Sequence, residues 1–325
     1  MFVQSKSRIE LLDLARGAAL VAMAIYHFAW DLQFFGYIGP GTTEIGGWKL
    51  FARAIAWTFL FIVGVSLFLA HSRGIRWPAF LRRLGLIVAA ALAISAVTWF
   101  AVPNGFIFFG ILHQIALASL VGLAFLRLPA FVTLAAAAFA IAAPHWLRAP
   151  IFDHLALWWV GLSTFDPPSN DYVPLFPWFG AVLAGIAGAR VASRIGLVQW
   201  LAAIEPGRWT APLILAGRHS LLVYLLHQPV LIATVWAFAQ VVPPQHQPPE
   251  ENFVRACEAT CAESRSPEFC PLYCACVLDR LAAENRLDAL FEGGQDAEMQ
   301  SRLNEIARAC TFETDMNLPQ GGGDE

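Results

Sequence analysis

The sequence predicts an all-α membrane protein, a polytopic bundle of about seven transmembrane helices followed by a small, disulfide-rich helical tail. Three observations predict this class. The chain is 58% hydrophobic and 14% charged, with a mean hydropathy of +0.57, which is more apolar than a soluble chain of 325 residues can bury. Apolar runs of spanning length recur through the first three quarters of the chain. All 6 cysteines lie after residue 250.

The apolar runs give the spans in order. Crossing about 30 Å of hydrocarbon takes about 20 apolar residues in a helix. The first run has no small-residue cleavage site after it, so we expect it to be a span and not a signal peptide. The segment 151–163 is too short to cross, and its Asp153 and His154 indicate an interfacial position. The expected spans are 11–30, 51–70, 84–102, 106–126, 129–143 (the shortest), 173–189 and 220–241.

The distribution of Lys and Arg predicts the orientation, because cytoplasmic loops are enriched in these residues. With the N terminus inside, eleven of them lie on the cytoplasmic side, and only Lys49, Arg53 and Arg148 lie outside. An odd number of spans then carries the tail across the membrane. We therefore expect the inner membrane of a bacterium, with a cytoplasmic N terminus and a periplasmic tail.

Charge and composition divide the chain into modules. Residues 1–249 hold 15 Lys/Arg and 8 Asp/Glu, whereas residues 250–325 hold 6 and 16. We expect a transmembrane domain at 1–242 and a proline-rich linker at 243–252 that includes Gln245, His246 and Gln247. A cysteine-rich helical tail follows at 253–315, and a disordered C terminus at 316–325.

The cysteine spacing predicts disulfides in the tail. Two pairs are each spaced i, i+4, so on two helices joined near Pro267 they face each other and can form two bridges. The last two cysteines are left as a third pair. A zinc site and thiol exchange are the alternatives, but no histidine lies among these cysteines and we expect no metal. The residues are Cys257, Cys261, Cys270, Cys274, Cys276 and Cys310.

The first span carries a polar stripe. At 100° per residue, Asp13, Arg16, His27 and Asp31 fall within a 60° arc of its helix. Ionisable groups inside a membrane are costly and indicate function. We expect His27 to be a catalytic base that Asp31 holds in one tautomer. The alternative is that Asp13 and Arg16 only neutralise each other, while His27 bonds a neighbouring carbonyl.

Other polar residues occur in the later spans. In the last span, Tyr224 and His227 share one face, and Arg218 precedes it at the cytoplasmic end. His113 is a third buried histidine. Each histidine also has a structural interpretation as a partner of backbone carbonyls. The sequence contains no phosphate loop, dinucleotide fingerprint or nucleophile elbow.

Two groups outside the spans have mainly structural interpretations. The arginines from Arg73 to Arg83 are expected to set the topology, although they could also meet a phosphorylated donor. Asp171 is placed to cap the sixth span, in a segment whose aromatic residues are typical of a membrane interface.

Several motifs resemble a known family. They are RIELLDLARG at 8–17 with His27 ten residues later, FLFIVG at 59–64, FGILH at 109–113, PLFPW at 174–178 and GRHSLLVYLLHQP at 217–229. Together they resemble the bacterial membrane proteins grouped with the catalytic domain of heparan-alpha-glucosaminide N-acetyltransferase. The Arg-Gly-then-His order is also similar to the wider transmembrane acyltransferases. The resemblance covers roughly residues 8–241 and not the tail.

The resemblance implies acyl transfer across the membrane, from acetyl-CoA to a hydroxyl or amine of an outward-facing sugar. Arg16 and Arg218 would bind the donor, and His27 would be the base or a transient acyl carrier. No histidine occurs between Phe28 and Ala70, so the histidine that the animal enzyme carries after its first span has no counterpart here. The expected partners are membrane lipids and a cell-envelope glycan, and no nucleic acid.

Two other functions fit the same residues. A transporter or flippase could use the polar stripe of the first span to conduct protons or an anionic headgroup. A membrane anchor could instead present the tail to a partner. Transport would show accumulation that depends on the proton gradient, without release of CoA. For an anchor, deletion of residues 250–325 would abolish the phenotype and leave any acyl transfer untouched.

Overall fold

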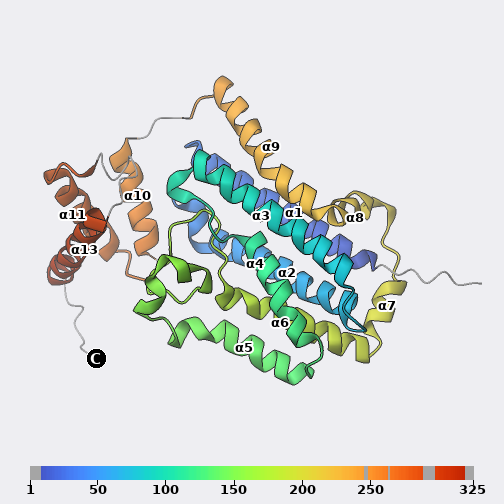
Figure 1. Ribbon diagram of the computed structural model, residues 1–325. Coiled ribbons are helices and arrows are strands. Elements are labelled where there is room, and N and C mark those ends of the chain that lie inside the picture. Colours follow the sequence, from blue (N-terminus) through green and yellow to red (C-terminus); the bar gives the residue numbers. More distant parts are fainter. Residues whose placement is uncertain (1–8, 245–247, 263, 288–296, 319–325) are drawn as a thin grey trace, which may run out of the picture. The chain divides into compact units, whose positions relative to one another are not determined.

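A computed structural model describes residues 9–244, 248–262, 264–287 and 297–318, and every regular element in this part of the chain is helical (Figure 1). Five helices are long and apolar enough to cross a membrane. They confirm the all-α, polytopic class. These helices are α1 (Glu10–Phe34), α2 (Gly46–His71), α3 (Trp77–Ala101), α6 (Leu175–Arg194) and α9 (Ser220–Val241).

Two shorter apolar helices occupy the places of the fourth and fifth expected spans. α4 (Ile111–Gly122) continues into the 3₁₀ helix η3 (Leu123–Leu126), and α5 covers Ala130–Trp146. The segment expected at the interface forms two 3₁₀ helices, η4 (Pro150–Asp153) and η5 (Leu155–Val160). Seven apolar helices thus lie where seven runs were expected, five of full length and two shorter.

The remaining elements of the body connect these helices. α7 (Leu197–Ala203) and α8 (Ala211–Arg218) lie between α6 and α9, and His219 separates α8 from α9. Three short 3₁₀ helices complete the body, η1 (Thr42–Glu44), η2 (Pro103–Gly105) and η6 (Arg208–Thr210).

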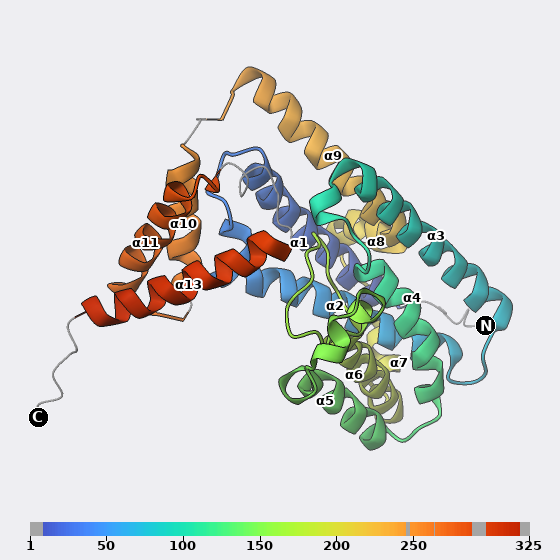
Figure 2. The same ribbon diagram turned by 60° about the vertical axis from the view of Figure 1, so that its left-hand side comes forward.

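The chain forms two compact units. The first contains residues 1–24 and 53–227, and the second contains residues 25–52 and 228–325. In the first unit α5 runs along α6, as Figures 1 and 2 show, and α4 packs on α3 and α6. Its core includes Leu60, Leu183 and Ile186, which are fully buried.

Glycines let α2 and α6 approach closely in the first unit. A Cβ atom on Gly64 would overlap the carbonyl oxygen of Val182, and one on Gly185 would overlap that of Phe61. Without a hydrophobic driving force between helices in lipid, small residues bring backbones into van der Waals contact. This reciprocal pair fixes the position of α2, which carries one wall of the site described below.

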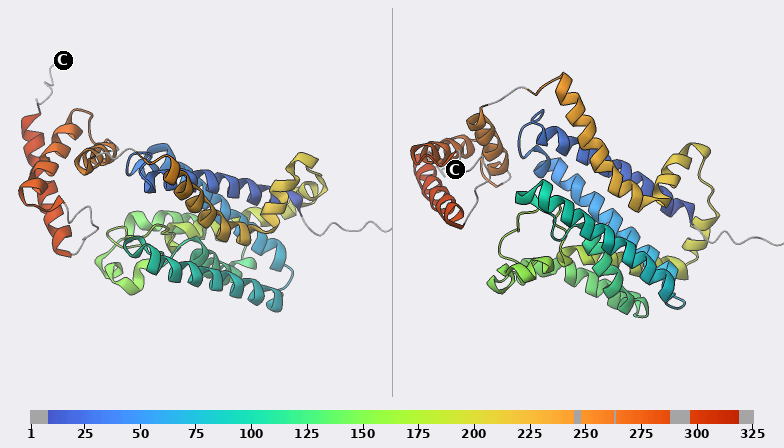
Figure 3. Two further views of the ribbon diagram at one scale, coloured as in Figure 1. Left: turned by 90° about the horizontal axis from the view of Figure 1, so that it is seen from above. Right: turned by 45° about the horizontal axis from the view of Figure 1, so that its top comes forward.

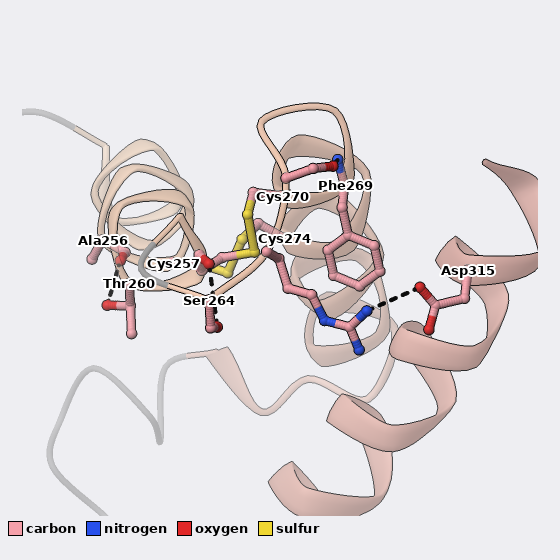
Figure 4. The surroundings of a disulfide bond; sticks show 11 residues. Ala256, Cys257, Thr260, Ser264, Phe269, Cys270, Cys274 and Asp315 are labelled. Carbon is pink, nitrogen blue, oxygen red and sulfur yellow. Dashed lines mark hydrogen bonds and ion pairs between the residues drawn. A yellow bond between two sulfur atoms is a disulfide. The ribbon is translucent and has the colours of Figure 1, made fainter. Parts of the chain in front are cut away.

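The tail helices belong to the second unit, and their ribbons are drawn in Figure 3. Three disulfides join them, and Figure 4 shows the surroundings of Cys257–Cys274. α10 (Pro249–Cys261) is bonded to α11 (Phe269–Ala283) through Cys257–Cys274 and Cys261–Cys270. α13 (Ala297–Asn317) is bonded to α11 through Cys276–Cys310. The expected helical hairpin with two bridges, and the third pair, are therefore confirmed.

The tail is also more helical than expected at both ends. α10 begins at Pro249, inside the expected linker, because proline is tolerated in a first helical turn and Glu250 and Glu251 favour a helix N terminus. α13 extends to Asn317, two residues into the segment expected to be disordered. Residues 245–247 and 319–325 lie outside the described residues.

Candidate functional site

A cavity of about 500 Å³ lies in the first unit between α1, α2, α3, α4, α8 and α9. Three arginines line it, together with His219. Two of them, Arg16 and Arg218, are the residues expected to bind the donor. Arg83 is the third. The other lining residues, mostly apolar, are Phe59, Ile62, Val63, Leu86, Ile87, Leu112, Ile115, Gly217, Ser220, Leu221, Leu222 and Tyr224.

Asp13 joins two of these arginines. Its Oδ1 accepts a hydrogen bond from Arg16 Nη1 at 2.8 Å, and its Oδ2 lies 3.6 Å from Arg218 Nε. The Asp13 side chain is only 1% exposed. Arg218 also donates from Nη2 to Glu10 Oε1 at 3.1 Å. A buried carboxylate that lies against two cations holds both guanidinium groups beside each other in the lining of the cavity.

Arg16 is also held by α2. Its Nη2 donates to the hydroxyl of Ser66, which in turn donates to the carbonyl oxygen of Ile62 at 2.6 Å. Partners on two helices fix a planar guanidinium group more firmly than a single ion pair does. Ser66 was not among the residues expected in the site, since a serine in an apolar run gives no distinctive signal.

Two glycines beside these arginines explain how α8 reaches α1. A Cβ atom on Gly17 would overlap the carbonyl oxygen of Leu213, and one on Gly217 would overlap that of Asp13. Each glycine therefore admits the backbone of the facing helix. In each helix a glycine stands next to an arginine, Arg16-Gly17 on α1 and Gly217-Arg218 on α8. The glycines allow the two helices to pack closely, and the neighbouring arginines bind Asp13.

The expected catalytic pair lies in the second unit, on the C-terminal half of α1. His27 is partly buried, and its ring stands edge-on to Tyr26 at 5.7 Å between centroids. Asp31 is fully buried, and its Oδ1 accepts a hydrogen bond from Gln228 Nε2 at 2.6 Å. Gln228, which sequence reasoning missed as a partner, lies between His227 and Pro229 in α9.

His113 has a partner at each ring nitrogen. Nδ1 accepts the backbone N–H of Gly110 at 3.2 Å, and Nε2 lies 3.3 Å from the hydroxyl of Ser95. That hydroxyl donates to the carbonyl of Ile107 at 2.6 Å, so it accepts from His113. With Nδ1 accepting and Nε2 donating, His113 closes the N-terminal turn of α4, which supports its structural interpretation.

Tyr224 lines the cavity, and His227 follows it by one turn of α9. The two rings lie 5.6 Å apart, and His227 Nδ1 lies 2.6 Å from the carbonyl oxygen of Tyr224. A carbonyl only accepts, so the proton of a neutral ring is on Nδ1. Nε2 is then the nitrogen with the chemistry of a base.

Asp171 caps a different helix from the one expected. α6 begins after Pro174 without a side-chain cap, whereas Asp171 Oδ2 accepts the backbone N–H of Ile111 at 2.9 Å and so caps α4. Burial raises the pKa of Asp171 to about 6, although the bond from Ile111 lowers it. Burial also raises the pKa of the neighbouring Tyr172 to about 12. The correction reflects a contact across 60 residues that local capping rules cannot reveal.

In the described part of the chain, no three His, Cys, Asp or Glu side chains lie close enough together to hold a metal ion. The six cysteines are all engaged in disulfides.

The comparisons with known proteins agree with the motifs. No curated protein and no solved structure is significantly similar to the chain. Residues 8–229, more than half of the chain, match the family model described as heparan-alpha-glucosaminide N-acetyltransferase, catalytic. The match contains every residue that lines the cavity, together with His27 and Asp31. The chain therefore belongs to the family of the heparan-alpha-glucosaminide N-acetyltransferase catalytic domain.

Proposed function

We propose that the protein transfers an acetyl group from cytoplasmic acetyl-CoA to a sugar hydroxyl or amine on the opposite side of the membrane. One observation carries the proposal: a member of a membrane acetyltransferase family has a cavity with arginines and apolar walls. That combination suits a donor with phosphates at one end and a thioester at the other.

The donor site would be the arginine end of the cavity. Arginine binds phosphate oxygens through a planar fork of N–H groups. Arg16 and Arg218 are held there by Asp13, so neither has to be ordered when a ligand arrives. Leu112 and Ile115 from α4 provide an apolar surface for the arm that carries the acetyl group.

The chemistry needs one base. The acceptor oxygen or nitrogen attacks the thioester carbonyl carbon, the C–S bond breaks, and CoA leaves as a thiolate that takes up a proton. The base removes the acceptor proton during the attack. His27 is our proposed base. It follows Arg16 on α1 by eleven residues, about 16 Å along the helix axis, and Asp31 follows it by one turn.

His227 is the alternative base. Its Nδ1–H is directed at the Tyr224 carbonyl, so Nε2 is the basic nitrogen, and Tyr224 itself lines the cavity. Comparison of His27→Ala with His227→Ala assigns the role. The base variant loses acetyl transfer and keeps donor binding.

The sidedness is part of the proposal. The excess of Lys and Arg at the helix ends and connections within residues 73–83 and 190–218 supports a cytoplasmic position for the arginines of the cavity. Alkaline phosphatase fused after residue 242 is expected to be active, and the same enzyme fused after residue 75 is expected to be inactive. The opposite pattern would reverse the orientation.

The first test is acetyl-CoA binding by the detergent-solubilised protein, measured by calorimetry. We expect saturable binding that Arg218→Ala weakens and His27→Ala does not. Arg208→Ala, at an exposed arginine of η6 that does not line the cavity, is the matched control. A folded parent protein that binds no acetyl-CoA would overturn the proposal, and gradient-driven uptake without CoA release would establish a transporter.

A further inference from the structure

The arginines of the cavity differ in how their charges are balanced. Glu10 and Asp13 lie within 4 Å of Arg218, and Asp13 also bonds Arg16. Among these four described residues, two carboxylates therefore face two guanidinium groups. The charges cancel, and this group by itself offers little net attraction to an anion.

Arg83 lacks such a counter-ion in the described part of the chain, where no carboxylate lies within 4.0 Å of its guanidinium group. The charge that acts on it most clearly is that of Arg16, which is also positive. A cation that faces another cation beside a largely apolar wall is stabilised when an anion joins them.

The position of Arg83 fits this role. Its side chain lines the large cavity and also a small recess beside it, whose other lining residues include His71, Phe80 and Ser119. Among the described residues, no acidic side chain lines either space. An anion that enters the large cavity would therefore be attracted most strongly by Arg83, whose positive charge no described carboxylate balances.

We propose that Arg83 is the principal phosphate-binding residue of this cavity, and that Arg16 and Arg218 mainly shape the site around it. The inference rests on the proposed function, because it takes the nucleotide phosphates of acetyl-CoA as the anion. An anionic lipid headgroup presents the same phosphate chemistry, and the experiment separates the two sources.

The neighbouring arginine provides a matched control. Arg82 precedes Arg83 on α3, is exposed, and points 100° away around the helix. It lines neither the cavity nor the recess. Arg82→Ala and Arg83→Ala each remove one positive charge from neighbouring positions of α3, so any effect on net charge or topology is common to both.

The experiment measures acetyl-CoA affinity in nanodiscs of phosphatidylcholine for the parent, R82A, R83A and R83K. Loss of one charge-assisted contact is expected to weaken R83A roughly ten- to a hundredfold. R83K should lose less because it retains the charge, and R82A should match the parent. The affinity of R83A should also depend less on salt than that of the parent.

A second ligand tests whether Arg83 acts through phosphate. S-acetylpantetheine lacks the nucleotide and is used as a competitor of acetyl-CoA. Its own dissociation constant, obtained from the competition, should be the same for the parent and R83A. A parent that binds acetyl-CoA together with an R83A as tight as R82A would overturn the role of Arg83 and leave the proposed function intact. If phosphatidylglycerol in the nanodiscs displaces acetyl-CoA from the parent but not from R83A, the phosphate is that of a lipid and the assignment to CoA is wrong.

Discussion

Removal of Arg16 should destabilise the protein as well as weaken donor binding. Asp13 is 1% exposed, and Arg16 lies 2.8 Å from its carboxylate. Arg16→Ala leaves this carboxylate buried with Arg218 as its nearest described cation, at 3.6 Å. The variant is therefore an ambiguous probe of ligand binding unless its stability is measured separately.

The size of the effect follows from the distances. At an effective dielectric constant of about 20, unit charges 2.8 Å apart attract by about 6 kcal/mol, and at 3.6 Å by about 5 kcal/mol. Arg16→Ala thus removes roughly half of the attraction that these two described arginines exert on Asp13. Breaking a buried pair typically costs 3–5 kcal/mol, and because Arg218 remains we expect about 3 kcal/mol.

A double-mutant cycle tests this reasoning. Asp13→Asn removes the buried charge, so Arg16→Ala should cost much less in that background, with a coupling of at least about 1.5 kcal/mol. Reversible unfolding in mixed micelles of dodecyl maltoside and SDS gives the four free energies. A coupling below about 0.5 kcal/mol would show that Asp13 does not depend on Arg16 and would refute the argument.

Three further results are expected. Gly17→Ala should cost about 1–3 kcal/mol and weaken acetyl-CoA binding, because its Cβ overlaps the Leu213 carbonyl and displaces α8; unchanged thermal stability and affinity would contradict this packing. For Asp171, burial raises the pKa from 3.8 to about 6, so its stability contribution is fully present below about pH 4 and is lost as the pH rises through 6. Asp171→Asn keeps an acceptor for the N–H of Ile111 but does not titrate. Its free energy of unfolding should therefore rise relative to that of the parent by on the order of 1–2 kcal/mol between pH 4.5 and 8, a value reduced because the carboxyl is partly exposed. Free energies of unfolding that run parallel against pH in the two proteins would exclude the effect. Finally, replacing Cys310 by serine opens a bridge across 34 residues and should cost the tail about 3–4 kcal/mol, visible as faster proteolysis of α13 in the full-length protein; equal cleavage rates would refute it.

The sequence contained enough to predict the membrane helices and the cysteine pairs. Both depend on local patterns, namely apolar runs of spanning length and an i, i+4 repeat of cysteines on two neighbouring helices. Arg16 and Arg218 could also be assigned to one donor site, because ionisable residues within membrane spans are rare and because both arginines lie in motifs that resemble one family. The cavity is lined by both of them.

What could not be predicted are the partners that tertiary packing supplies. Asp31 bonds Gln228 from a position 197 residues away, and Asp171 bonds the backbone of Ile111, which no local rule for capping includes. The partner of a polar residue buried in a bundle depends on which helices pack together. Helical periodicity in the sequence predicts only the face of the helix on which that residue lies. For the same reason the sequence could not distinguish Arg83, which lines the cavity, from the other arginines between Arg73 and Arg83.

The charge balance of the cavity connects folding with binding. A site made of three uncompensated arginines would repel itself in the absence of ligand, so the empty protein would be unstable. Here Asp13 neutralises Arg16 and shares Arg218 with Glu10, and the glycines beside those arginines bring the helices close enough for one carboxylate to reach both. Of the three arginines that line the cavity, Arg83 is the one without a carboxylate partner among the described residues. The arrangement therefore confines the cost of an unbalanced charge to a single exposed residue on α3, and it predicts that changes at Arg16 affect stability first whereas changes at Arg83 affect affinity first.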